Sequence, residues 1–255
     1  MRTLISLLAF FLLSSLSFTA QGRRLFVVSV GIDAYMYATQ LPNCENDARD
    51  MAALFRRHTT AITLVTGKAA TRTGIVNALA AFRQAGPDDV VLFYFSGHGV
   101  EGGLCPIDMG GPSRNAPLEY TTLQSAMRNS KAARKIMIID ACYSGGLRQG
   151  NKLRSVARGS HSGNEKAEVL LFLSSRGNEL SAASRNMRNS LFTHYLLRGL
   201  KGGADADRDR VVTASEIYTF VKSRFVAAAG KKAQNPVMWG KFSNSMPIIN
   251  WNPRR

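Results

Sequence analysis

The chain has 255 residues, of which 45% are hydrophobic and 20% are charged. This length and balance indicate one ordinary globular domain with a substantial core. Lys and Arg outnumber Asp and Glu by 33 to 17, but the basic residues are scattered and form no recognisable motif, so we predict no specific nucleic-acid partner.

The first 20 residues predict a signal peptide that is not part of the fold. A basic start precedes an apolar run over residues 4–16, and small residues follow up to Ala20. The run is too short for a stable membrane span, and cleavage is expected near residues 20–22. We therefore expect an exported protein, periplasmic or secreted, whose domain covers residues 23–255. An uncleaved membrane anchor is the alternative.

Apolar strands and amphipathic helices alternate along the rest of the chain. This order predicts an α/β fold with a mainly parallel sheet, covered on both faces by helices. The expected strands cover residues 25–32, 62–65, 90–95, 136–139 and 169–173, and the expected helices cover about 48–55, 73–82, 119–130, 191–196 and 214–229. Residues 100–117 are rich in Gly and Pro and predict a small hairpin and loop.

Two of these strands end in residues that could carry out chemistry. The strand at 90–95 continues into Ser96-Gly97-His98-Gly99, and the strand at 136–139 continues into Asp140-Ala141-Cys142-Tyr143-Ser144-Gly145. If the strands are parallel neighbours, His98 and Cys142 face each other at the carboxyl edge of the sheet, where open α/β proteins bind ligands. An imidazole beside a thiol lowers the thiol pKa, so the pair predicts nucleophilic catalysis. The alternative is a purely structural role, with a histidine that supports the fold and a buried, inert cysteine.

The two motifs resemble the signatures of caspase-like peptidases, and Asp140 in place of glutamine is closer to bacterial metacaspase-like proteins. The resemblance covers most of the chain after residue 24. It implies a caspase-like three-layer sandwich with about six strands, the last near residues 235–239. It also implies a cysteine endopeptidase that needs no cofactor for its chemistry. In this reaction Cys142 attacks the peptide carbonyl and the backbone N–H groups of Gly99 and Cys142 stabilise the oxyanion, while His98 protonates the leaving amine.

The resemblance extends to a substrate pocket. Metacaspases form an acidic pocket from the aspartate before the cysteine, the serine before the histidine and an aspartate in a Cys-x-Asn-Asp segment. The matching residues here are Asp140, Ser96 and Asp47. Asp140 and Ser96 each lie two residues before the reacting residue, and so on the same face of their strands. We therefore expect a peptide or protein substrate cut after Arg or Lys, and not after Asp. The alternative for Asp47 is a helix cap.

Residues 147–166 are basic and rich in Gly, Ser and Asn, which predicts an exposed loop. In caspase-like enzymes the corresponding linker is often cut, which would separate a large segment of about 23–147 from a small segment of about 167–255. Basic residues in the loop suit the same specificity, so self-processing is expected there. An uncut surface loop is the alternative.

A separate stretch, residues 205–216, has oxygen ligands at the spacing of an EF-hand calcium loop. The ligands would be Asp205, Asp207, Asp209, the Val211 carbonyl, Thr213 and Glu216. Arg210 occupies the position that glycine usually holds. The stretch is either a Ca²⁺ site or a solvated acidic turn that caps the last helix. The separate acidic cluster through which metacaspases bind calcium is poorly matched, with Asp108 as one counterpart.

The remaining thiols and the type of reaction each leave more than one interpretation open. Cys44 and Cys105 either pair in a disulfide or are simply buried. A module that binds or signals with a vestigial His98–Cys142 pair is the second functional hypothesis. A relative that transfers the acyl group to an amine is the third, because hydrolysis and ligation share a thioester. We predict no oligomeric state.

Overall fold

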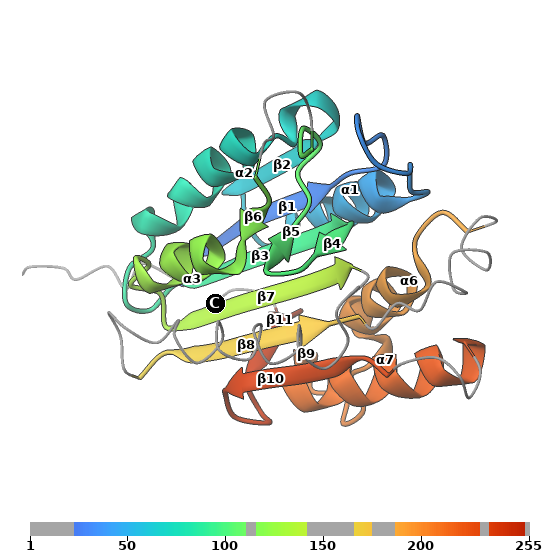
Figure 1. The fold of residues 1–255 in the computed structure, drawn as a ribbon. Helices are drawn as coiled ribbons and strands as arrows, with labels where there is room; N and C mark the ends of the chain where they lie inside the picture. The colour runs from blue at the N-terminus through green and yellow to red at the C-terminus, as the bar shows by residue number, and fades with distance from the viewer. Residues whose placement is uncertain (1–22, 111–115, 142–165, 175–186, 230–234, 253–255) are drawn as a thin grey trace, which may run out of the picture.

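The computed structural model describes residues 23–110, 116–141, 166–174, 187–229 and 235–252. At its centre is a six-stranded sheet with the strand order β10-β8-β7-β3-β1-β2 (Figure 1). Its strands are β1 (Leu25–Gly31), β2 (Ile62–Thr66), β3 (Val90–Gly97), β7 (Arg134–Ala141), β8 (Glu168–Leu173) and β10 (Val237–Lys241). The first five pair in parallel, and β10 pairs antiparallel with β8. The predicted α/β fold with a mainly parallel sheet is confirmed.

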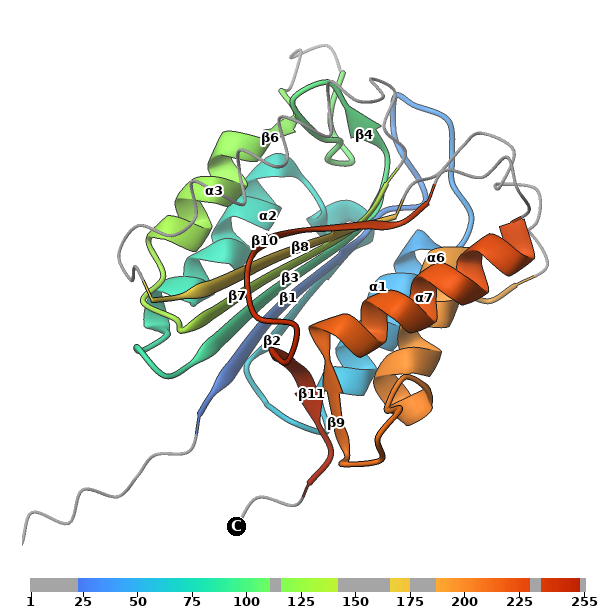
Figure 2. The same cartoon turned by 90° about the horizontal axis from the view of Figure 1, so that it is seen from below.

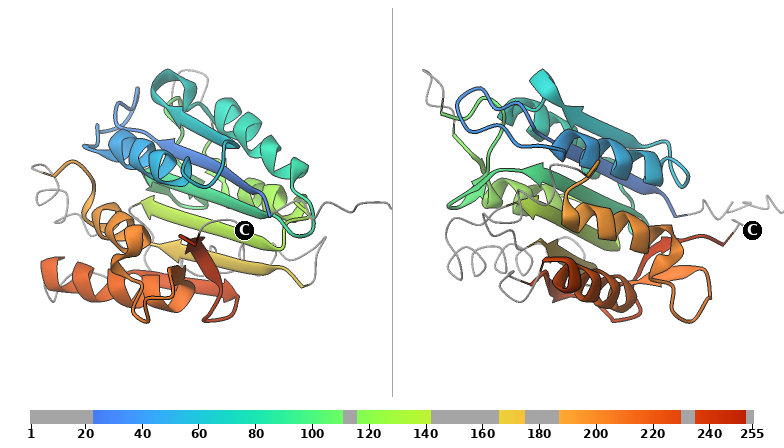
Figure 3. Two further views of the ribbon diagram at one scale, coloured as in Figure 1. Left: turned by 180° about the vertical axis from the view of Figure 1, so that it is seen from behind. Right: turned by 90° about the vertical axis from the view of Figure 1, so that its right-hand side faces the viewer.

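Helices cover both faces of the sheet. On one face lie α2 (Arg72–Leu79) and α3 (Tyr120–Arg128), as Figure 2 shows. On the other face lie α1 (Cys44–Phe55), α6 (Leu191–Arg198) and α7 (Ala214–Ala229). The rear view on the left of Figure 3 shows these three helices in front of the sheet. The three layers follow from strands that are apolar on both sides, because each side must be covered.

The alternation of side chains along β3 divides the core into two layers. Phe93 and Phe95 point into the core under α2 and α3, whereas Leu92 and Tyr94 point into the core under α1, α6 and α7. All eight residues of β3 are buried. Successive strand residues point to opposite faces, so a fully buried strand needs a helical layer on each side.

Shorter elements complete the described chain. Three short strands follow His98 and form a small sheet, β4 (Gly99–Val100), β5 (Gly103–Leu104) and β6 (Leu118–Glu119). A second pair joins β9 (Val211–Thr213) to β11 (Pro247–Asn250). The short helices η1 (Gly67–Ala69) and η2 (Ala80–Gln84) are 3₁₀ helices, and η4 (Gly199–Gly203) is a π-helix. The hairpin predicted within residues 100–117 is therefore present in part as β4 and β5. The β9–β11 pair was not predicted, because strands of three or four residues give no periodicity.

The predictions for the cysteines, the signal peptide and the basic linker can be compared with the described residues. Cys44 and Cys105 are both buried and no disulfide joins them, so burial is confirmed and the disulfide interpretation is wrong. The predicted signal peptide and residues 147–165 of the basic linker lie outside the described residues. Among the residues that the structure describes, no helix combines the length and the hydropathy needed to span a membrane.

Candidate active site

The carboxyl ends of β3 and β7 lie side by side. Their parallel register pairs Ser96 with Asp140 and Gly97 with Ala141. His98 follows Gly97 directly, so the strand neighbourhood on which the predicted His98–Cys142 pair depends is present. Cys142 follows Ala141 in the sequence and lies outside the described residues.

The backbone of His98 is held by Tyr35. The His98 N–H donates to the Tyr35 hydroxyl at 2.8 Å, and that hydroxyl donates to the Cys105 carbonyl at 3.2 Å. The Cys105 N–H donates in turn to the His98 carbonyl at 2.9 Å. A Cβ at Gly97 would lie 2.5 Å from the Tyr35 hydroxyl oxygen, so glycine is needed for this close approach.

The His98 imidazole is half-buried and meets a backbone carbonyl. Its Nε2 lies 2.7 Å from the Thr39 oxygen, and its ring centroid lies 4.7 Å from that of Tyr35. A carbonyl only accepts hydrogen bonds, so Nε2 carries the hydrogen and Nδ1 is the ring nitrogen that can take up a proton. Sequence reasoning missed Thr39, because a main-chain acceptor leaves no side-chain pattern.

The three predicted pocket residues, Asp47, Ser96 and Asp140, come together in one buried cluster. The Ser96 hydroxyl donates to Asp47 Oδ2 at 2.9 Å, and Ser96 is the register partner of Asp140. Each of the three side chains is 0% exposed. Asp47 comes from α1, Ser96 from β3 and Asp140 from β7, so the packing of three distant elements forms the cluster.

Hydroxyl groups from the chain after β8 surround the Asp140 carboxylate. Ser174 and Ser190 donate to its two oxygens, and Thr193 Oγ1 donates to Oδ2 at 3.0 Å. The Ser190 N–H also donates to Asp47 Oδ1 at 3.0 Å, so this residue joins the two carboxylates. Buried carboxylates need such donors, because burial without compensation is costly. The sequence predicted the two acids but not these three hydroxyl donors.

Neighbouring contacts fix α1, which carries Asp47. Asp33, just after β1, accepts from the Glu45 N–H at 3.1 Å, and burial raises the pKa of Asp33. The Asp47 carboxylate accepts from the Ser96 hydroxyl and the Ser190 N–H, so it links α1 to β3 and to the start of α6.

Asp50, one turn further along α1, holds the chain that enters α6. Its carboxylate binds the Arg188 guanidinium at 2.8 and 2.9 Å and the Asn189 side-chain amide at 3.0 Å. The Arg188 hydrogen bond holds the pKa of Asp50 below its ordinary value. Residues 188–190 are thus tied to α1 beside the buried cluster.

The sequence of almost the whole fold matches a known protein family. The family model described as the caspase domain, peptidase family C14, matches residues 24–245. The chain belongs to this caspase-domain family. Membership supports a cysteine peptidase in general, and with it a peptide substrate.

Comparison with solved structures agrees on the fold. The crystal structure of protein GSU0716 from Geobacter sulfurreducens is similar to this chain with a TM-score of 0.57 and 22% sequence identity. The match covers 86% of this chain and 95% of that chain. At this identity the likeness bears on the fold alone, and it confirms the predicted caspase-like sandwich. No curated protein matches the chain in sequence.

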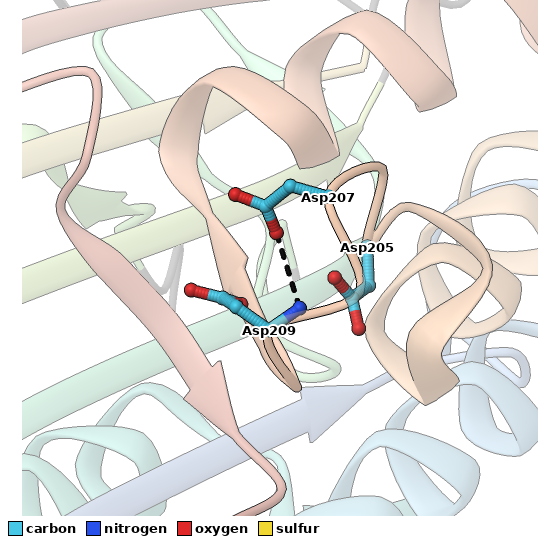
Figure 4. Close-up of side chains that lie close together, drawn as sticks. All are labelled: Asp205, Asp207 and Asp209. Atoms are coloured by element: carbon cyan, nitrogen blue, oxygen red, sulfur yellow. Dashed lines mark hydrogen bonds between the residues drawn. The ribbon is translucent and has the colours of Figure 1, made fainter.

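The predicted calcium loop is folded as a compact acidic turn (Figure 4). Asp205, Asp207 and Asp209 each place a carboxylate oxygen within 4.8 Å of the others, and Asp205 Oδ1 is buried with no hydrogen-bond partner among the described residues. Arg210 takes the left-handed conformation, with φ at 69°, and its N–H donates to Asp205 Oδ2 at 3.1 Å. Arginine thus adopts the backbone conformation that glycine usually supplies at this position.

Glu216 and Thr213, the other predicted side-chain ligands, form a capping box at the start of α7. Glu216 Oε2 accepts from the Thr213 N–H at 2.9 Å, and the Glu216 N–H donates to Thr213 Oγ1 at 3.4 Å. Glu216 Oε1 accepts from the Ala206 N–H at 2.9 Å, and Val211 lies in β9. The helix-capping alternative is therefore present, and calcium binding stays a prediction. Asp108, which the resemblance offered as one counterpart of the metacaspase cluster, accepts from the Arg72 N–H at 3.1 Å.

Proposed function

We propose that this caspase-domain protein is an exported cysteine endopeptidase that cleaves after Arg or Lys, with Cys142 as nucleophile and His98 as acid and base. The observation that carries the proposal is the buried Asp47–Ser96–Asp140 cluster beneath the strand end that bears His98. Support for export comes from the apolar segment at residues 4–16, which has the length of the apolar region of a signal peptide.

The chemistry follows from the placement of the imidazole hydrogen. With Nε2–H held by the Thr39 carbonyl, Nδ1 takes the proton of the Cys142 thiol. The thiolate adds to the peptide carbonyl, and the N–H groups of Gly99 and Cys142 stabilise the oxyanion. The imidazolium then gives its proton to the leaving amine, and a thioester remains. Water, deprotonated by His98, hydrolyses the thioester and restores the thiol.

Specificity for basic residues follows from the charge of the cluster. Two carboxylates lie within hydrogen-bond reach of Ser190, so the cluster favours a cation over a substrate carboxylate. Asp47 and Asp140 are fully buried, and binding of a substrate side chain therefore requires the cluster to open. Cleavage within residues 147–166 is the corresponding self-processing reaction.

The test is turnover of fluorogenic peptides that end in Arg, Lys or Asp by the exported form of the chain. We expect cleavage of the Arg and Lys peptides and a loss of at least about 1,000-fold in Cys142→Ala. Preference for the Asp peptide overturns the pocket assignment. Product formed with an added amine in place of the free acid identifies a ligase, and no turnover together with no thiol labelling identifies a vestigial module. Mass mapping of fragments, compared with Cys142→Ala, tests self-processing.

A further inference from the structure

A chain of buried hydrogen bonds runs from the centre of the sheet to the Asp140 carboxylate. The Tyr94 hydroxyl lies 2.6 Å from Thr193 Oγ1, and Thr193 Oγ1 lies 3.0 Å from Asp140 Oδ2. All three side chains are fully buried. Tyr94 comes from β3, two residues before Ser96 and on the same face of the strand, and Thr193 comes from the first turn of α6.

The direction of the two hydrogen bonds follows from counting hydrogens. Thr193 Oγ1 donates to Asp140 Oδ2, and a threonine hydroxyl has only one hydrogen. Tyr94 must therefore donate to Thr193. Each hydroxyl polarises the next, which strengthens the bond that reaches the carboxylate.

We propose that Thr193 is a positioning residue that fixes the orientation of the Asp140 carboxylate in the substrate pocket, and that Tyr94 in turn fixes Thr193. This inference rests on the proposed function. Thr193 does not act on the substrate itself, since its one hydrogen is committed to Asp140.

The orientation of the carboxylate matters more for one basic substrate than for the other. A guanidinium is planar and presents its donors in a rigid fork, so it needs a carboxylate in a fixed plane, whereas an ammonium is a compact charge with rotatable donors. Ser174 and Ser190 also donate to Asp140, so loss of the Thr193 hydroxyl removes one of the donors to Oδ2 and holds the carboxylate plane less tightly without leaving it unpaired. Loss of the Thr193 hydroxyl should therefore weaken Arg substrates more than Lys substrates.

The test measures kcat and KM for matched Arg and Lys peptides in the mature enzyme. Thr193→Val removes the hydroxyl and keeps the branched shape. We expect KM for the Arg peptide to rise about tenfold, kcat to change less than about twofold, and the Arg-to-Lys ratio of kcat/KM to fall several-fold. Thr193→Ser keeps the hydroxyl and should match wild type, and Tyr94→Phe should give a smaller change, about threefold, in the same direction.

Thr59→Val is the matched control. The Thr59 hydroxyl donates to the Leu25 carbonyl at 2.7 Å, at the opposite end of the sheet, so this variant should lose stability but keep the wild-type KM and ratio. An unchanged KM and ratio in Thr193→Val, or equal losses for both peptides, overturns the inference. Should Thr193→Val fail to fold, an unchanged ratio in Tyr94→Phe overturns it. Wild type that cleaves neither peptide refutes the proposed function instead.

Discussion

At the scale of single residues, Tyr35 does more for the site than its place in a loop indicates. Its hydroxyl accepts from the His98 N–H and donates to the Cys105 carbonyl, and its ring packs against the imidazole. The side chain is buried, so neither bond can be replaced easily by water. Tyr35 therefore fixes the backbone from which His98 projects.

Tyr35→Phe tests this role. It leaves the His98 N–H without its acceptor, and we expect a loss of about 1–3 kcal/mol in the free energy of unfolding, since a buried donor is left unsatisfied. kcat/KM for the Arg peptide should fall about tenfold, mainly through kcat, because the acid–base residue loses its fixed position. Tyr218→Phe, in α7, is the control. Normal activity with lower stability would show that Tyr35 supports only the fold.

The sequence predicted the acidic pocket residues, but it did not predict the groups that hydrogen-bond to them and to His98. Ser96 and Asp140 could be predicted from their spacing before His98 and Cys142, and Asp47 from the resemblance of its Cys-x-Asn-Asp segment to metacaspases. Thr39, Tyr35 and Thr193 could not, because a carbonyl or hydroxyl in a loop or a helix start has no periodic signal. Only packing of distant segments selects them.

At the scale of elements, the turn over residues 205–216 has two sets of interactions. The Thr213–Glu216 capping box stabilises the start of α7, and the carboxylates of Asp205, Asp207 and Asp209 lie close to one another in the turn before it. Like charges held this close repel one another unless a cation or solvent compensates them. The turn should therefore respond to divalent cations through its aspartates rather than through the helix cap.

Calcium is expected to raise the melting temperature through these aspartates. At ten times the dissociation constant, binding to the folded state adds about 1.4 kcal/mol of stability. Asp207→Asn keeps the acceptor for the Asp209 N–H but removes one charge, so its calcium-dependent shift should be much smaller. The measurement is thermal unfolding in EGTA and in millimolar calcium, with Asp88→Asn as control. Equal shifts in all three proteins, or none, would contradict calcium binding here.

At the scale of the whole molecule, alternation of strands and helices determines the layers, while the order of strands depends on packing between distant segments. The parallel sheet could be predicted from buried apolar runs. Edge strand β10 was expected near residues 235–239 from the family resemblance alone. Its antiparallel pairing and the β9–β11 pair could not be predicted, because their residues show neither continuous burial nor strict alternation.

The central sheet contains a buried basic side chain among its apolar residues. Lys135, in β7, is fully buried beside Val91 and Val169, and burial lowers its pKa to about 8. The unfolded chain has its ordinary pKa of 10.5 and so binds more protons between pH 8 and pH 10.5. The stability of wild type should therefore gain from rising pH across this window.

Lys135→Met should remove that dependence. At pH 7 we expect the variant to be more stable by about 1–3 kcal/mol, because no ammonium is buried, and the difference should shrink as the pH approaches 10.5. Urea unfolding at about pH 7 and about pH 10 measures it, with the exposed Lys131→Met as control. A difference that does not change with pH would show that charge burial is not its cause.

The adjacency of β7 and β8 has a consequence for how a severed chain would behave. These strands are joined along Arg134–Ile139 and Glu168–Leu173, although the whole basic stretch separates them in sequence. Asp50 and Arg188 add a second tie between the halves. Cleavage within that stretch would leave the two fragments associated, so the elution volume in native size-exclusion chromatography would not change. Only a denaturing gel would show two bands.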